Sequence, residues 1–191
     1  GLGDVYKRQD RIFTHKNIMS RSIDLNVEKE NLWKNLRKSY KSPINKGLRE
    51  QEIILLDYKN PREEIFKEIQ TLHFLVAGRK TRSQTTWDLQ FSAIKKDNGF
   101  AICSLQGTKL TGAVYFLKTY NHSYYSVGIF TSESKKKLYG YCLIWKAILY
   151  CKERNIKFVE LDHNVNYKYP TTLDQKLVKI SHFKSGFGGE I

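Results

Sequence analysis

Two places along the chain carry side chains that could take a proton from an incoming amine. Asp162 ends a short apolar segment that begins at Phe158, and His163 follows it directly. Carboxylate and imidazole groups are common general bases in such a step. Ligands gather beyond the carboxyl ends of strands, so Asp162 and His163 are our candidates for the catalytic base. His73, which has apolar neighbours within an expected helix, is better interpreted as a histidine at the edge of the core.

Basic side chains gather at three places that could bind a phosphate or a carboxylate. Arg79 and Arg82 lie between two expected helices, where two guanidinium groups could clamp an anion through paired hydrogen bonds. Residues 34–49 include six basic residues and no acidic one, and among them Lys38 is a candidate to contact the substrate. The third place is a run of three lysines that ends at Lys137. Each of the three could equally be a solvated surface that binds nothing.

The elements that must hold these side chains follow from hydrophobic periodicity. Apolar residues four apart from Leu32 to Leu48 predict a helix or a helix pair, interrupted near Pro43. The lysines and arginines of this segment would form a positive ridge on the opposite side. A buried strand is expected over residues 52–58, followed by a helix with Pro61 at its first position.

Local signals mark the ends of the helices that follow. Gly78 is expected to end the helix that starts at Pro61, and Ser83 is expected to cap a further helix that ends at residues 97–99. A later helix would begin at Leu138, and Asn155 would end it in the left-handed conformation.

A change from helical to strand periodicity after residue 99 predicts the sheet. Three strands joined by tight turns form an antiparallel meander, and a helix then leads to a strand that should lie parallel to an earlier one. A last strand is expected near the C-terminus. Besides the strand over residues 52–58, the expected strands are residues 100–105, 110–117, 124–130, 158–162 and 177–183. The fold class is therefore α+β, a sheet with helices on its faces.

This order of elements is the one expected of the GCN5-related N-acetyltransferase (GNAT) fold, and residues 182–189 resemble the Phe-Lys-x-x-Phe-Gly signature of the FemABX family. The resemblance extends to residues 32–39 and 78–87 and covers most of residues 26–191. FemABX proteins are aminoacyltransferases that build peptidoglycan cross-bridges, and those with that activity carry two such domains. The resemblance implies a single-domain relative or a C-terminal domain. It also implies a mixed sheet, mostly antiparallel, with one parallel pair around a central helix and helices on both faces.

The same resemblance implies an acyl-transfer site around Lys184. The lysine of the signature contacts the reacting groups, and a cation beside the developing oxyanion would stabilise the transition state. Phe183 would wall the site, Tyr125 would contact the substrate, and backbone N–H groups in the gap between residues 124–130 and 158–162 would bind the acyl carbonyl. The alternative interpretation is an exposed lysine on a late strand, followed by a glycine-rich turn.

A second resemblance concerns the three-lysine run. Lys137 and Gly140 match the Arg/Gln-x-x-Gly-x-Gly/Ala loop of acetyl-CoA-dependent relatives, whereas Cys142 departs from it. In those relatives the N-terminus of a helix binds pyrophosphate through N–H groups and the helix dipole. Lys137 and Gly140 are thus candidates to bind the cofactor part of an acyl-CoA donor. A solvated turn before a helix is the alternative.

The composition limits the class of protein. The 191 residues include 33 Lys and Arg against 19 Asp and Glu, which gives a formal charge of +14, and 40% of the residues are hydrophobic. This is enough for a substantial core and excludes a disordered basic tail. Three separated cysteines argue against a disulfide framework or a zinc site and favour a reducing cytoplasm, and we expect no metal. No apolar stretch approaches the roughly 20 residues of a membrane helix, which leaves peripheral contact with the inner face of a membrane.

The ends of the sequence indicate a fragment. Residues 1–9 resemble translated sequencing-adapter read-through, residues 10–25 form a poorly defined lead-in, and residues 26–191 form the expected domain. The chain lacks an initiator Met and stops in mid-pattern after a run of glycines. An N-terminal domain of the same protein is therefore among the expected partners.

Three functions are compatible with these patterns. The leading hypothesis is a bacterial-type cytoplasmic enzyme that transfers an acyl or aminoacyl group to an amine of a cell-envelope precursor, either peptidoglycan or a sugar nucleotide. Its donor, acyl-CoA or aminoacyl-tRNA, would be a substrate and not a permanently bound cofactor, and its acceptor would be an anionic or lipid-linked molecule. DNA is not an expected partner. The second hypothesis is an acetyl-CoA-dependent N-acetyltransferase of a small amine or amino sugar. The third is a basic RNA-binding module or a non-catalytic half-domain.

Overall fold

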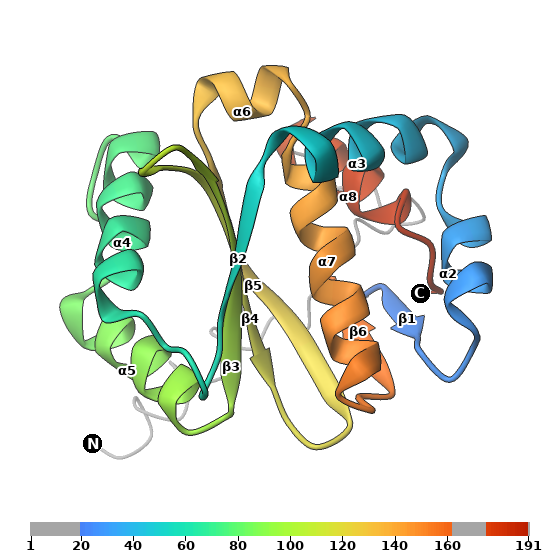
Figure 1. Cartoon of the computed structure of the whole chain (residues 1–191), viewed down its shortest axis with the longest axis horizontal. Coiled ribbons are helices and arrows are strands. Elements are labelled where there is room, and N and C mark those ends of the chain that lie inside the picture. The colour runs from blue at the N-terminus through green and yellow to red at the C-terminus, as the bar shows by residue number, and fades with distance from the viewer. Residues whose placement is uncertain (1–19, 162–174, 191) are drawn as a thin grey trace, which may run out of the picture.

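The computed structural model describes residues 20–161 and 175–190, and within these residues the chain forms one sheet between two helical layers (Figure 1). The strands are β1 (Ser22–Asp24), β2 (Glu52–Leu56), β3 (Gly99–Gln106), β4 (Lys109–Lys118), β5 (His122–Phe130) and β6 (Phe158–Glu160). The helices are α2 (Lys29–Asn35), α3 (Lys38–Glu50), α4 (Glu63–Ala77), α5 (Gln84–Lys95), α6 (Ser132–Lys136), α7 (Gly140–Glu153) and α8 (Gln175–Ser185).

The sheet has the order β1-β6-β5-β4-β3-β2 in the described part of the chain. Strands β5 and β6 are parallel and are connected through α7, whereas the other four neighbouring pairs are antiparallel. The expected meander is β3, β4 and β5. The predicted α+β class, with one parallel pair around a central helix, is confirmed. β1 lies at one edge of the sheet and precedes residue 26, at which we expected the domain to begin.

Each face of the sheet is covered by its own helical layer, and each layer has its own core (Figure 1). Helices α4 and α5 cover one face, where Phe66, Ile69 and Trp87 pack against the sheet; we call this side the α4–α5 layer. Helix α7 covers the other face together with α2, α3 and α8, and we call this side the α7 layer. The central helix is buried around most of its circumference, as its apolar sequence predicts.

Several helix ends lie where local signals place them. Gly78 ends α4 in the left-handed conformation, with φ of 67°. Ser83 caps α5, because its side chain accepts a hydrogen bond from the Thr86 N–H. Asn155 is left-handed just after α7, with φ of 58°. The start of α4 differs from the prediction, because Arg62 is left-handed and the helix begins only at Glu63, two residues after Pro61.

The predicted interruption near Pro43 is wrong. Pro43 lies inside α3, and the helices α2 and α3 are instead separated at Leu36 and Arg37, both of which have extended ψ values. The Arg37 N–H donates to the carbonyl oxygen of Gly186 over 2.8 Å, so a distant segment holds the break open. The buried side chain of Ile44 anchors α3 past the proline. Tertiary contacts therefore outweigh the loss of one helical hydrogen bond.

The predicted last strand, residues 177–183, is wrong as well, because this segment belongs to α8. Ser181 and Lys184 are buried and Phe187, just beyond the helix, continues the same three-residue spacing. Two of the three inward positions are thus polar. Buried polar residues weaken the helical period of the hydrophobic pattern, and the sequence of this short segment therefore predicts a strand.

Candidate functional site

The parallel pairing of β5 and β6 covers only three residues. Partners run from His122 and Phe158 to Tyr124 and Glu160, after which β6 ends while β5 continues to Phe130. A β-bulge follows immediately. Val127 faces Tyr115 and Tyr125 faces Phe116, so Ser126 is the extra residue. A bulge redirects the strand and its side chains, and here it lies where β5 leaves its parallel neighbour.

Lys184 reaches this point of β5 from α8. Only 5% of the residue is exposed, and its Nζ lies 5.2 Å from the centroid of the Tyr125 ring. An ammonium group over an aromatic face is attracted by the ring quadrupole. Lysine side chains are mostly exposed, because a buried ammonium group must gain partners that replace its contacts with water. The alternative interpretation of Lys184 as an exposed residue on a strand is therefore wrong.

Four aromatic rings form a cluster around the same helix. The Tyr40 ring lies 4.5 Å from Tyr141 and 5.2 Å from Phe187, and the Phe183 ring lies 5.0 Å from Tyr141. The Tyr40 hydroxyl donates to the Phe183 carbonyl oxygen over 2.7 Å. Burial, reinforced by Tyr141, raises the pKa of Tyr40 to about 12, which keeps this hydroxyl a donor. In the sequence, Tyr40 falls in the stripe of residues four apart from Leu32 to Leu48, which predicts only a core position for it.

A glycine of the C-terminal signature is required by this cluster. A methyl group on Gly186 would overlap the Tyr40 ring, so a side chain has no room there. Gly188 and Gly189 have φ values of 88° and 81°, in the left-handed region, and the Glu190 N–H that follows donates to the Ser22 carbonyl oxygen. The glycines therefore let the C-terminal segment approach α3 and β1.

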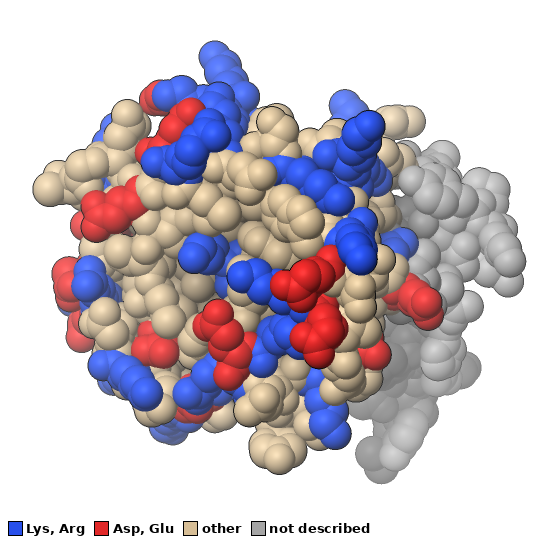
Figure 2. All heavy atoms as spheres, turned by 45° about the vertical axis from the view of Figure 1, so that its right-hand side comes forward, with Lys and Arg blue, Asp and Glu red and all other residues tan. Residues whose placement is uncertain are grey.

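Arg37 fixes α8 from the break between α2 and α3. Its Nη2 donates to the Ser185 Oγ over 2.9 Å and to the His182 carbonyl oxygen over 3.2 Å. The sequence predicts Arg37 on the positive ridge, either solvated or facing a phosphate, and the signal that could have found its structural role is its position beside the helix break. Lys38, the residue expected to contact substrate, is exposed at the start of α3. On the face shown in Figure 2, acidic side chains lie among the basic ones, so the charge does not gather in a single ridge there.

The loop before α7 is already internally bonded. The N–H groups of Lys137, Leu138, Tyr139 and Tyr141 donate to backbone carbonyl oxygens of residues 133–138. The Lys137 Nζ pairs with Glu133 over 2.6 Å, and this carboxylate raises the pKa of Lys137. Gly140 faces the Phe130 ring, which a methyl group would crowd. A pyrophosphate site needs backbone N–H groups that point at the ligand. Of the five backbone N–H groups in Lys137–Tyr141, these four already donate to carbonyl oxygens of the chain.

Arg79 and Arg82 lie in the α4–α5 layer, on the other side of the sheet from Lys184 (Figure 1). They line a cavity of about 270 Å³. The Arg82 Nη1 lies 2.8 Å from the His73 Nε2, and its guanidinium group lies 5.6 Å from the Trp87 ring centroid. Burial, followed by the charge of Arg82, lowers the pKa of His73, which favours the neutral imidazole. His73 is thus a partly buried acceptor at the edge of the core.

The remaining sequence candidates divide into two groups. Asp162 and His163 lie outside the described residues. The three cysteines are buried, and burial raises the pKa of Cys142 and of Cys151 to about 12, which disfavours the thiolate that a nucleophile requires. The described residues contain no group of three or more His, Cys, Asp or Glu side chains arranged to hold a metal ion.

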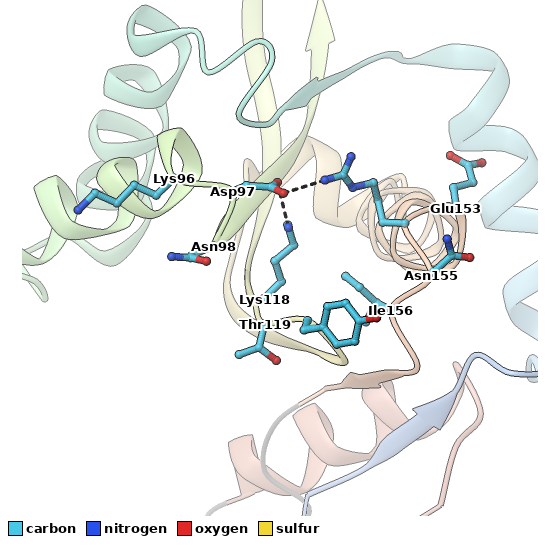
Figure 3. Close-up of a pocket in the computed structure, with 10 residues that line it drawn as sticks. Lys96, Asp97, Asn98, Lys118, Thr119, Glu153, Asn155 and Ile156 are labelled. Atoms are coloured by element: carbon cyan, nitrogen blue, oxygen red, sulfur yellow. Dashed lines mark hydrogen bonds and ion pairs between the residues drawn. The ribbon is translucent and has the colours of Figure 1, made fainter.

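Two further cavities lie away from Lys184. One of about 530 Å³ opens at the lower end of the sheet, where Asp97 bridges Lys118 at 2.9 Å and Arg154 at 2.7 Å (Figure 3). These ion pairs tie β4 and α7 to the turn after α5. The other, of about 790 Å³, lies between β1, α2 and the C-terminal glycines, with Phe187 in its wall.

Solved structures share this arrangement. FemX superposes with a TM-score of 0.72 at 10% identity over 93% of this chain and 61% of its own. The C-terminal DUF2156 domain of a protein assigned as lysylphosphatidylglycerol synthetase, from Agrobacterium fabrum, gives 0.65 at 12% identity over 91% and 57%. An aminoglycoside acetyltransferase from an uncultured soil metagenomic sample, in complex with sisomicin, gives 0.54 at 14% identity over 75% and 92%.

The chain has a FemABX/GNAT-like fold. It spans about three fifths of the length of FemX and of the Agrobacterium protein's chain. A scan against protein-family models and a search of curated proteins find no match. Among the described residues, no helix is both long and apolar enough to cross a membrane.

Proposed function

We propose that this domain transfers an aminoacyl group from aminoacyl-tRNA to an amine of a cell-envelope precursor. The observation that supports the proposal most is the burial of Lys184 against Tyr125, at the bulge where β5 separates from β6. Within the described residues, this point joins a cation to the stretch of β5 that continues beyond its parallel pairing with β6. A carbonyl oxygen that gains negative charge needs such donors.

The reaction would proceed by addition and elimination at the ester carbonyl of the donor. The amine nitrogen attacks the carbonyl carbon, a C–N bond forms, and the carbonyl oxygen becomes an oxyanion. The Lys184 ammonium group and backbone N–H groups of β5 would stabilise that charge. The C–O bond to the tRNA ribose then breaks, and the proton lost by the amine passes to the ribose oxygen. Phe183 and its aromatic neighbours would keep water from the ester.

The loop before α7 favours aminoacyl-tRNA over acyl-CoA as the donor. Its N–H groups and Lys137 are engaged within the chain, as described above, and a pyrophosphate would have to displace those bonds. The FemABX resemblance implies that the acceptor is an amine of a peptidoglycan precursor or a sugar nucleotide. The product of the transfer is then an amide.

The first experiment incubates the 191-residue chain with radiolabelled aminoacyl-tRNA, or with labelled acetyl-CoA, and a mixture of peptidoglycan and sugar-nucleotide amines. Lys184→Met should lower kcat by about 10²–10³-fold, because it removes the cation while filling the same volume. Lys179→Met, an exposed lysine on the same helix, is the matched control and should retain activity. Thermal unfolding of both variants separates a chemical defect from a folding defect.

Two results would contradict the proposal. Consumption of neither donor would show that the chain is not a transferase of this kind. Transfer from acetyl-CoA alone, abolished by Lys137→Glu, would favour the acetyltransferase hypothesis, because that substitution should leave tRNA-dependent transfer intact.

A further inference from the structure

The carboxyl-terminal end of α4 exposes three large apolar side chains in succession. Leu75 is 68% exposed, and Phe74 and Val76 are also exposed. Soluble proteins seldom place three such residues side by side without a partner for them. The polar chain that follows carries Arg79 and Lys80, which are exposed as well. Residues 69–87 contain no acidic residue, so nothing within this segment offsets its positive charge.

A second apolar and basic group lies at the same end of the sheet. Helix α6 and the end of α4 are both at the top in Figure 1. Lys135 and Lys136 of α6 are exposed, and Leu138 just beyond them is 44% exposed. Leu138 has φ of 62°, a left-handed conformation that is costly for a branched side chain. An apolar side chain is thus held outward in a strained backbone beside two lysines.

We propose that these two groups form one surface that docks on a bilayer of anionic phospholipids. The apolar side chains of α4 and Leu138 would enter the boundary between head groups and acyl chains, and the lysines and arginines would face lipid phosphates. Each group combines exposed apolar residues with neighbouring basic residues. This combination complements such a bilayer, whose surface is anionic and whose interior is apolar. A neutral protein partner would match the apolar residues and leave the charge unused.

The cavity beside Arg79 fits the phosphate of a lipid head group. Its lining includes Arg79, Lys80 and Arg82 together with Trp87. His73, which lines the same cavity, holds the Arg82 guanidinium group through the contact between Arg82 Nη1 and His73 Nε2. Guanidinium groups bind phosphate through paired hydrogen bonds.

This surface would also explain how the acceptor reaches the site, and that part of the inference rests on the proposed function. The part of β5 beyond its pairing with β6 runs toward the same upper end of the sheet (Figure 1). A lipid-linked amine held in the bilayer would thus approach the Lys184 site from the membrane side. Docking would raise the local concentration of such an acceptor without any change at the site itself.

The test is co-sedimentation of the chain with vesicles of phosphatidylcholine alone and of phosphatidylcholine mixed with phosphatidylglycerol. We expect binding to the anionic vesicles only, weakened by salt. Leu75→Glu and the double variant Lys80→Glu/Lys136→Glu should each weaken it about tenfold or more. Leu89→Glu is the matched apolar control, because Leu89 on α5 is 67% exposed. Lys95→Glu/Lys96→Glu is the matched charge control, and both controls should bind as the unchanged chain does.

Several outcomes would overturn the proposal. They are a lack of binding to anionic vesicles, an equal loss in the controls, and a loss of tRNA binding in the double variant without loss of vesicle binding. A change from dimer to monomer on Leu75→Glu would assign the surface to a second copy of the chain. Vesicle binding without aminoacyl transfer would leave this inference standing and remove the proposed function, whereas transfer without vesicle binding would do the reverse.

Discussion

The two layers of the molecule differ in where they place a charged side chain and where they expose apolar ones. The α7 layer buries a lysine, a serine and a tyrosine hydroxyl around α8, within a cluster of aromatic rings. The α4–α5 layer has an apolar core against the sheet and carries apolar side chains on its outer surface. Burying a polar group costs free energy unless it gains partners, and exposing apolar area costs free energy in water. The proposed transfer site lies at the first of these two departures from the usual pattern, and the proposed membrane surface lies at the second.

The largest effect on stability is expected from Phe66→Ala in the α4–α5 layer. Phe66 is 1% exposed and contacts Trp87 and Phe91, so its loss leaves a cavity that should cost about 3–5 kcal/mol of unfolding free energy. Denaturant titration measures this cost. Aminoacyl transfer at a temperature where the variant stays folded should be unchanged, because the sheet separates Phe66 from Lys184. A large fall in kcat would break the division between the layers.

A smaller loss of stability, coupled to function, is expected from Gly186→Ala. The added methyl group would push Tyr40 away and cost about 1–3 kcal/mol through overpacking. Transfer activity should fall as well, since Tyr40 positions the backbone of Phe183. Gly78→Ala is the control: it has open space around it and strains only the backbone. Equal activity in the two variants, measured on folded protein, would contradict a role of the aromatic cluster in positioning α8.

Arg37→Ala should loosen α8 without removing any group from the proposed chemistry. Loss of the bonds to Ser185 and to the His182 carbonyl oxygen should cost about 1–2 kcal/mol. Because Arg37 would act through α8, we expect a lower kcat with an unchanged pH profile, and partial recovery in Arg37→Lys. Lys38→Ala, at an exposed position one residue away, should have little effect on stability.

The smallest effect is expected from the pH dependence of His73 in the α4–α5 layer. Burial and Arg82 lower its pKa in the folded chain, so the unfolded chain binds more protons below the ordinary pKa of about 6.5. Its contribution to stability is therefore present above that pH and is lost as the pH falls. Melting temperatures of the chain and of His73→Phe should converge or cross between about pH 7 and pH 5. If the two melting temperatures fall in parallel as the pH is lowered, the pH dependence of stability belongs to groups other than His73.

Local signals were sufficient for most of the fold. Ser83, Gly78 and Asn155 act on the backbone within a few residues, and the meander follows from alternation and turns. The predicted strand at residues 177–183 failed because α8 buries Ser181 and Lys184, which hides the helical period. The site was foreseeable only in part, since Lys184 and Phe183 came from a resemblance.

The sequence by itself determined the α+β class, the antiparallel meander and the parallel strand after α7, because each of these depends on periodicity, turns and caps that act over a few residues. Only the tertiary structure decided that Arg37 and Tyr40 support α8, that Lys184 is buried on Tyr125, and that Arg79 and Arg82 lie on the opposite face. Those contacts join residues about 60 to 150 positions apart in the sequence. Such residues meet only when the layers pack together, and local patterns do not specify that packing.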